Sequence, residues 1–252
     1  MGRWEVLLMV MKIFVLGQPG SGKSTAVRRI KEIAQKRGYT VKSFNDYTIL
    51  RKWADEAIDE SKFRKTANGG FDVLDFTIFD KSLKVLEKRI TQENLTSSKD
   101  IITIEFARND YALAFEQFSA SFRQNAYILF IDAENDTCKE RIVMRAKHRH
   151  SDDDHPVSDD IFATYYYKKS VDCISSYLDS LHLIRGTREQ QNEKLLRVTV
   201  IHNYGHNPKE SFDFAIRQFA LRLIRKCNLI SGKPAKAKRI AKKKSFELAP
   251  SN

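Results

Sequence analysis

Residues 11–25 read MKIFVLGQPGSGKST, in which an apolar run leads directly into a glycine-rich loop. The loop matches the pattern GxxxxGK(S/T) in full, from Gly17 to Ser24. A chance match in a chain of this length has odds on the order of one in a hundred, given average residue usage. The apolar run predicts a buried strand at Lys12–Leu16, and the residues after the loop predict a helix from Ser24 to about Arg37.

The glycine-rich loop predicts a site for a nucleoside triphosphate. Glycines let successive backbone N–H groups face one anion, and the N-terminus of the following helix adds positive potential. In this arrangement Lys23 reaches the β- and γ-phosphates, and Ser24 offers its hydroxyl to Mg²⁺. A guanine-specific Asn-Lys-x-Asp motif does not occur, so ATP is preferred to GTP. The residues expected to bind ATP here are Gly17, Gln18, Pro19, Gly20, Ser21, Gly22, Lys23, Ser24 and Thr25.

Short β-type runs alternate with helical patterns along the rest of the chain. This alternation is typical of an α/β protein with a parallel sheet and helices on both faces. The expected fold is the three-layer P-loop NTPase fold with a five-stranded parallel sheet. The other four strands are expected at Tyr39–Phe44, Ile101–Phe106, Ala126–Asp132 and Val198–His202.

Apolar residues at spacings of three and four predict the helices between the strands. Besides the first helix, one holds Arg51, one begins at an N-cap at Asp75 and one runs from Asp110 to Arg123. Three more are expected: from a cap at Asp136 to Arg149, from a cap at Ser158 to about Leu181, and from Pro208 to Ile224.

The chain is expected to form one P-loop domain over residues 1–225. Residues 61–74 read as a turn or hairpin inserted at the rim, and residues 148–157 as a polar loop that could act as a lid. We hypothesise that residues 1–10 are an extension that the fold does not need, because Met11 opens the first strand. Residues 226–252 form a basic tail that is expected to be disordered.

Composition limits the class of protein. The net charge of +12 comes largely from the tail, where eight Lys or Arg residues stand against one acid, so the tail could bind nucleic acid. Cys138, Cys173 and Cys227 are scattered, which argues against a disulfide scaffold or a zinc site and favours the cytoplasm. The apolar run before the loop is too short to cross a bilayer, so no membrane segment is expected.

Four segments resemble the nucleoside monophosphate kinases, the P-loop group that includes the adenylate kinases. They are Met11–Thr25, Ile102–Arg108, Phe130–Ala133 with the helix that carries Arg141 and Arg145, and Val198–Asn203. The resemblance implies that Glu105 lies near Mg²⁺ and that Arg108 contacts the phosphate of the acceptor. It also implies that Arg141 packs against the adenine and that Arg145 reaches the transferring phosphate.

Other readings of these side chains remain open. Arg141 and Arg145 share one helical face, which is explained by a nucleotide cleft or by a solvated basic surface. Asp46 follows the second strand, where several related kinases hold an acid that takes the hydroxyl proton of the acceptor, but capping of the next helix explains it equally well. Either Asp46 or Glu105 is the expected base. Lys168 and Lys169 are candidates for phosphate contacts or for ordinary surface residues.

The sequence thus favours ATP-dependent phosphoryl transfer, with Mg²⁺, to a nucleotide or other small metabolite. Two alternatives stay open: a kinase or ATPase that acts on nucleic-acid ends through the basic tail, and a nucleotide-binding protein without catalysis. The residues expected to carry catalysis are Lys23, Asp46, Glu105, Arg108 and Arg145, with Ser24 and Glu105 at the metal. The identity of the acceptor and the oligomeric state stay open.

Overall fold

The computed structural model describes residues 10–230 apart from 57–60, 67–69, 94, 96–98, 124–125, 149–156, 166–196 and 207–208. Several expectations fall outside this part of the chain: most of the lid at 148–157, the pair Lys168 and Lys169, the tail beyond residue 230, and residues 1–9. Val10 is described and fully buried, so at least this residue of the hypothesised extension belongs to the packed core.

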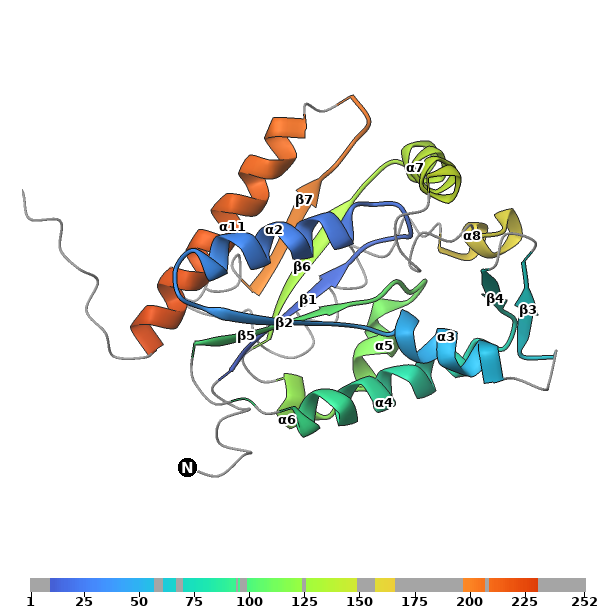
Figure 1. The fold of residues 1–252 in the computed structure, drawn as a ribbon, viewed down its shortest axis with the longest axis horizontal. Coiled ribbons are helices and arrows are strands. Elements are labelled where there is room, and N and C mark those ends of the chain that lie inside the picture. The colour runs from blue at the N-terminus through green and yellow to red at the C-terminus, as the bar shows by residue number, and fades with distance from the viewer. Residues whose placement is uncertain are drawn as a thin grey trace, which may run out of the picture.

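A five-stranded parallel sheet forms the centre of the molecule (Figure 1). Its strands lie in the order β2-β5-β1-β6-β7, and every neighbouring pair is parallel. All five predicted strands are confirmed to within one residue at each end. Their bounds are β1 Met11–Leu16, β2 Thr40–Asn45, β5 Asp100–Glu105, β6 Ala126–Asp132 and β7 Val198–His202.

The register brings the carboxyl ends of the strands to one edge of the sheet. In β1, Ile13 lies between Thr103 of β5 and Tyr127 of β6, and Val15 pairs with Glu105 at the end of β5. Ligands of open parallel sheets bind at this edge, where strand order changes direction. The loops that follow β1, β2, β5 and β6 are therefore brought together although they are far apart in the sequence.

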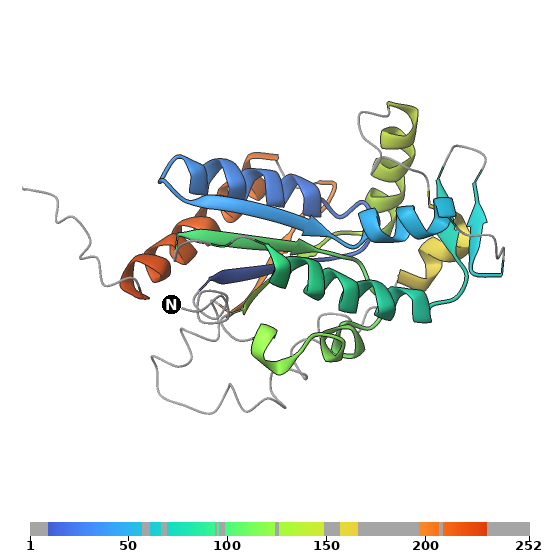
Figure 2. The same ribbon diagram turned by 60° about the horizontal axis from the view of Figure 1, so that its bottom comes forward.

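Helices cover both faces of the sheet, as the sequence predicts (Figure 2). On one face, α2 and α11 pack against Ile13 and Val15; on the other, α4, α5 and α6 pack against Phe14. The Phe14 ring lies 5.0 Å from the ring centre of Phe115 and 5.1 Å from that of Phe118. The helices are α2 Lys23–Gln35, α3 Tyr47–Glu56, α4 Thr77–Gln92, α5 Tyr111–Glu116, α6 Ala120–Arg123, α7 Asn135–Lys147, α8 Asp159–Tyr165 and α11 Lys209–Ile230.

The insertion predicted at 61–74 is a small antiparallel hairpin of β3 (Phe63–Lys65) and β4 (Phe71–Val73). It lies beside α8 at the carboxyl edge of the sheet (Figure 1). Arg64 of the hairpin pairs with Asp72 at 2.8 Å and with Asp160 of α8 at 3.0 Å. The hairpin and α8 are therefore joined by ion pairs at the edge where the loops converge.

Three details of the helix predictions were wrong. The helix expected over Asp110–Arg123 is two helices, because the side chain of Ser119 accepts the N–H of Phe122 and starts α6 anew. Asp136 lies inside the first turn of α7 and does not cap it. Ser158 directly precedes α8, as predicted, and its carbonyl accepts the N–H of Phe162, while its hydroxyl donates to Asp72. The last helix also continues past residue 225 to Ile230.

One charged side chain, Lys12, is fully buried in the central strand. Its ammonium lies 3.5 Å from the carbonyl oxygen of Val10 and 5.7 Å from the ring centre of Phe122. Burial lowers the pKa of Lys12 to about 8. Between this value and the ordinary pKa of 10.5 the unfolded chain keeps a proton that the folded chain has lost, so stability rises with pH in this window.

We expect Lys12→Met to raise the free energy of unfolding at pH 7 by about 3 kcal/mol, the cost of keeping a proton on the buried amine. The gain should shrink as the pH rises from 8 towards 10.5, because the wild-type chain sheds that proton. Urea unfolding of both proteins at pH 7 and pH 10 measures the difference. Equal stability of the two proteins at pH 7 would contradict the assignment of a charged, desolvated Lys12.

Candidate active site

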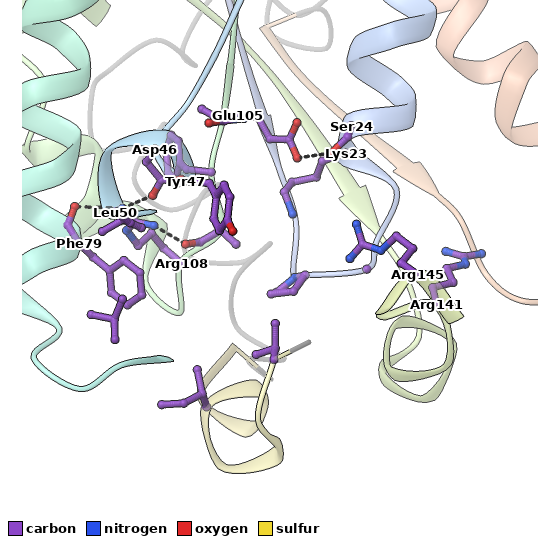
Figure 3. A pocket seen from close by; sticks show the side chains of 18 of the residues that line it. Lys23, Ser24, Asp46, Tyr47, Leu50, Phe79, Glu105, Arg108, Arg141 and Arg145 are labelled. Atoms are coloured by element: carbon purple, nitrogen blue, oxygen red, sulfur yellow. Dashed lines mark hydrogen bonds and ion pairs between the residues drawn. The ribbon is translucent and has the colours of Figure 1, made fainter. Parts of the chain in front are cut away.

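A pocket of about 470 Å³ opens at the carboxyl edge of the sheet. The loops after β1, β2 and β5 form its floor, and α3, the β3–β4 hairpin, α7 and α8 form its walls. Figure 3 shows Lys23, Ser24 and Glu105 between two groups of side chains, with Asp46 and Arg108 on one side and Arg141 and Arg145 on the other. The pocket is large enough for a nucleotide and part of an acceptor.

The glycine-rich loop joins β1 to α2 and is held from three directions. Tyr111, buried beneath the loop, accepts the N–H of Gly17 at 2.9 Å. The amide of Gln18 donates to the carbonyl of Ala133 at 2.8 Å, after β6. Asn203, after β7, donates its amide to the carbonyl of Ser21 at 2.7 Å. The shape of the loop is thus set before any ligand binds, which is the condition for a pre-organised anion site.

Gly20 lies where the loop passes closest to α7. Its φ of +80° favours glycine, and a Cβ atom there would overlap the carbonyl oxygen of Cys138. Gly38 has a similar φ of +76°, but a Cβ atom there would meet nothing within 4 Å. Both glycines therefore share the backbone strain, whereas only Gly20 would also suffer a steric clash. Substitutions at the two positions distinguish the two effects.

We expect Gly20→Ala to weaken binding of an ATP analogue by at least about tenfold, because the loop must move away from Cys138. Gly38→Ala is the matched control: both variants should lose on the order of 1 kcal/mol of stability from the strained backbone. Calorimetric titration with the analogue and urea unfolding of each variant measure the two effects. Unchanged nucleotide affinity in Gly20→Ala would contradict the role of this contact.

Lys23 begins α2 and is buried at the floor of the pocket. Its ammonium donates to the carbonyl of Gln18 at 3.0 Å, inside the curl of the loop. Burial lowers the pKa of Lys23, while the nearby carboxylate of Glu105 raises it and the guanidinium of Arg145 lowers it further. A bound anion would relieve the cost of this buried positive charge.

Ser24 and Glu105 present oxygen atoms of the kind that Mg²⁺ binds. The hydroxyl of Ser24 donates to Oε1 of Glu105 at 2.8 Å. Mg²⁺ in phosphate sites takes only one or two protein ligands and completes its shell with water and phosphate oxygens. The pair therefore fits this ion, even though no cluster of three or more His, Cys, Asp or Glu residues occurs in the part of the chain that the structure describes.

Asp46 directly precedes α3, and its backbone carbonyl accepts the N–H groups of Ile49 and Leu50, but its side chain does not cap the helix. Asn45 supplies that cap, since its Oδ1 accepts the N–H of Thr48 at 3.2 Å. Asp46 instead lies in a buried ion pair, with Oδ2 2.7 Å from Nη2 of Arg108. Nη2 of Arg108 also donates to the carbonyl of Phe79 at 3.0 Å, and the guanidinium lies 4.5 Å from the Phe79 ring centre. Both side chains line the pocket and are held by each other.

The two arginines of α7 line the opposite wall of the pocket. Arg141 donates to the backbone carbonyl of Asn203 at 3.2 Å and is half-buried, as is Arg145. Their spacing of four residues brings both guanidinium groups to one side of the helix (Figure 3). This geometry argues against a solvated basic surface.

Comparison with known proteins agrees with the nucleotide site that the geometry of the pocket indicates. A family model described as an AAA domain matches residues 16–158 of the chain. The UMP-CMP kinase of Xenopus tropicalis is 32% identical over 146 residues, which cover 56% of this chain and 70% of that protein. The chain belongs to the nucleoside monophosphate kinase group of P-loop kinases. It is a phosphotransferase, which disfavours the alternative of a nucleotide-binding protein without catalysis.

Solved structures similar to this kinase include a gluconokinase from Sinorhizobium meliloti 1021, with a TM-score of 0.45 and 16% identity. That match covers 88% of this chain and 98% of the gluconokinase. Kti12 of Chaetomium thermophilum matches with a TM-score of 0.49 and 16% identity, over 85% of this chain and 97% of that one.

Among the described helices, none is long and apolar enough to cross a bilayer.

Sequence patterns did not reveal three side chains that shape the site of this kinase. Tyr111 supports Gly17, and burial raises the pKa of Tyr111 to about 12. Tyr204 donates to Asp132 at 2.7 Å, and this bond raises the pKa of Tyr204 to about 12. Asp72 of the hairpin lines the pocket and is almost fully buried. Only the position of Tyr204 after the last strand gave a signal, because loops there border the nucleotide site.

Proposed function

We propose that this kinase transfers the γ-phosphoryl group of ATP, bound with Mg²⁺, to a small acceptor molecule. The observation that supports the proposal is that two groups of charged side chains lie on opposite sides of one pocket. Lys23 and Arg145 approach it from the loop and from α7, and the Asp46–Arg108 pair approaches from the strands β2 and β5. A phosphate donor and an acceptor could therefore face each other across the floor of the pocket.

The donor is proposed to lie over the glycine-rich loop. Backbone N–H groups between Gly17 and Thr25 surround its phosphates, with Lys23 near the terminal one. Arg141 borders the adenine, close to the loop at Asn203. Ser24 and Glu105 would hold Mg²⁺, which would supply positive charge to offset the negative charge of the phosphates.

Catalysis of phosphoryl transfer in this site depends on how the side chains position the reactants and on the charges that they carry. The acceptor hydroxyl is oriented by Asp46, which takes its proton, and Arg108 fixes the Asp46 carboxylate through the buried ion pair. Lys23 and Arg145 stabilise the negative charge that spreads over the transferring group. Glu105 is assigned to the metal rather than to the acceptor, because its carboxylate accepts the hydroxyl of Ser24.

Closure is proposed for the segment that begins at His148 and ends at Val157. Its central residues lie outside the described chain, but Val157 lines the pocket and α8, which follows, is joined to the hairpin through Arg64 and Asp160. A lid anchored in this way would exclude water from the transferring group.

Two measurements test the proposed function. Titration with a non-hydrolysable ATP analogue should give an affinity that falls when Mg²⁺ is removed, because Ser24 and Glu105 would hold this ion and its positive charge would offset the negative charge of the phosphates. ADP release should rise when a suitable acceptor from a panel of nucleotides, nucleosides and common metabolites is added. A protein without magnesium-dependent affinity for any nucleoside triphosphate would exclude the proposal.

A further inference from the structure

We propose that the outer surface of α2 and α11 binds the backbone of a single-stranded nucleic acid. Five exposed cations carry this proposal, and we call them the basic face: Arg28 and Lys31 of α2, Lys36 directly after α2, and Arg217 and Arg225 of α11. None of them lines the pocket. The basic face is therefore separate from the active site, and binding there goes beyond the proposed function.

The two helices that carry the basic face lie side by side on one face of the sheet (Figure 1). Ile30 of α2 and Ile216 of α11 are buried in the same core cluster as the strands. Between the helices, Nη2 of Arg29 pairs with Oδ2 of Asp213 at 2.6 Å. Because the core and this ion pair hold α2 and α11 together, their exposed sides form one surface.

Acids close to the basic face do not neutralise it. The two helices hold three acids, and two of these, Glu32 and Asp213, are paired with Arg29. The third, Glu210, lies in the first turn of α11. No cation of the basic face forms an ion pair within the part of the chain that the structure describes. Positive charge without local compensation attracts polyanions, and guanidinium groups bind phosphate with two parallel hydrogen bonds.

The helices on the other face of the sheet do not share this excess of positive charge. Together, α4, α5 and α6 carry five Lys or Arg residues against three acids. In α2 and α11 there are eight against three, without Lys23 of the pocket. The net charge of the chain is thus concentrated on one side of the folded domain, which is the distribution expected of a protein that binds nucleic acid.

An exposed aromatic ring lies on the same surface as these cations. Phe214 is 61% exposed, and among the described residues of α2 and α11 it is the only large apolar side chain that is exposed. Phe214 and Arg217 are three residues apart, so they share one side of α11. Proteins that bind single strands combine cations along the backbone with aromatic side chains on which the bases stack. The surface offers both kinds of contact.

An anionic membrane is the competing partner for a basic helical surface. Helices that lie in a membrane interface bury a broad apolar side in the lipid. The apolar sides of α2 and α11 are instead buried in the core of the protein, and of their described large apolar side chains only Phe214 is exposed. The single exposed ring among cations therefore favours a nucleic acid over a membrane.

Oligonucleotide binding to charge variants tests the basic face. Fluorescence anisotropy with a labelled oligouridine and a labelled oligothymidine of about 20 nucleotides measures affinity as salt is raised. Arg217→Gln with Arg225→Gln should weaken binding by about tenfold or more at about 0.1 M salt, and should lower the slope of log affinity against log salt by about 1.4, since each lost phosphate contact in a single strand lowers it by about 0.7.

Lys84→Gln with Lys88→Gln is the matched control, because it removes the same charge from exposed positions of α4. Its oligonucleotide affinity should stay within about twofold of wild type. Neither double variant should change the affinity for an ATP analogue, which shows that both are folded, since none of the four residues lines the pocket. Equal losses of oligonucleotide affinity in the two double variants would show that net charge alone attracts the strand and would overturn the proposal.

Phe214→Ala tests for stacking. It should weaken oligouridine binding about tenfold without changing the salt slope, because stacking releases no counterions. Leu113→Ala on α5 is the control, since Leu113 is 56% exposed on the other side of the sheet. Its affinity for oligouridine should match that of wild type. Unchanged affinity in Phe214→Ala would overturn the assignment of a single strand to this surface.

Two further measurements separate the basic face from other sources of binding. Neutralising Lys242, Lys243 and Lys244 to glutamine leaves the basic face intact, so salt-dependent binding should persist; its complete loss would assign the strand to the tail and overturn the proposal. Vesicles that contain phosphatidylserine should bind more weakly than the oligonucleotides, and tighter binding of the vesicles would identify a membrane as the partner. A protein that binds neither oligonucleotide would refute the inference without affecting ATP-dependent transfer.

Discussion

Replacing Lys23 with methionine is expected to lower kcat by about 10³-fold, the loss found when one strong donor to a transition state is removed. The amine of Lys23 lies inside the curl of the glycine-rich loop, where the terminal phosphates of ATP are proposed to bind. Methionine keeps an unbranched apolar stem but removes the ammonium group and its charge. Single-turnover assays of ATP with a saturating acceptor measure the effect on the chemical step.

Whereas kcat of Lys23→Met should fall, the stability of this variant should rise. Because burial lowers the pKa of Lys23, the ammonium is unfavourable in the folded chain at neutral pH, and Lys23→Met should raise the midpoint of thermal unfolding. Lys12→Met is the matched control, since it replaces another buried lysine, outside the pocket, and should raise stability without loss of turnover. A less stable Lys23→Met protein would attribute the lost activity to the fold instead of to the missing charge.

The strands of this protein could be predicted because their signals are local. Four of them are short apolar or β-branched runs, which is typical of buried parallel strands. The exception is β2, which is mostly not buried. The loop from Gly17 to Thr25 is equally local, since the backbone geometry of a phosphate cradle imposes glycines and a lysine at fixed spacing. The family resemblance then extended the prediction to Arg141 and Arg145, which share a helix and so have a fixed relation.

The acceptor side was harder to predict because its contacts join segments that are distant in sequence. Asp46 and Arg108 lie 62 residues apart and are each compatible with other local roles; only the pairing of β2 with β5 brings them together. Asp72 contacts Ser158 across 86 residues, from an insertion that has no periodic pattern. The end of α5 was missed for a similar reason, since Ser119 also binds Glu87 of α4.

Replacing Asp46 with asparagine is the second change with a large expected effect. The amide cannot take the proton of the acceptor hydroxyl, so kcat should fall by about 10² to 10⁴-fold, the usual contribution of a general base. The fall should be seen with every acceptor, and the affinity for the ATP analogue should not change. Asp55→Asn, on the helix that follows Asp46, is the matched control, because Asp55 is exposed and pairs with Arg51 outside the pocket. A control that loses activity to the same degree would assign the effect to α3 rather than to the base.

Asp46→Asn should also bind a nucleoside monophosphate more tightly than wild type does, a gain that misfolding cannot produce. Without the carboxylate, Arg108 keeps its place between Phe79 and Phe106 but loses its partner charge, and its guanidinium becomes available to an anion. A nucleoside monophosphate should then bind Asp46→Asn about tenfold more tightly than it binds wild type, while the parent nucleoside should not. Calorimetric titration of both proteins with uridine and with UMP measures this difference. If the variant does not bind UMP more tightly than wild type does, the pair with Asp46 does not limit the access of an anion to Arg108.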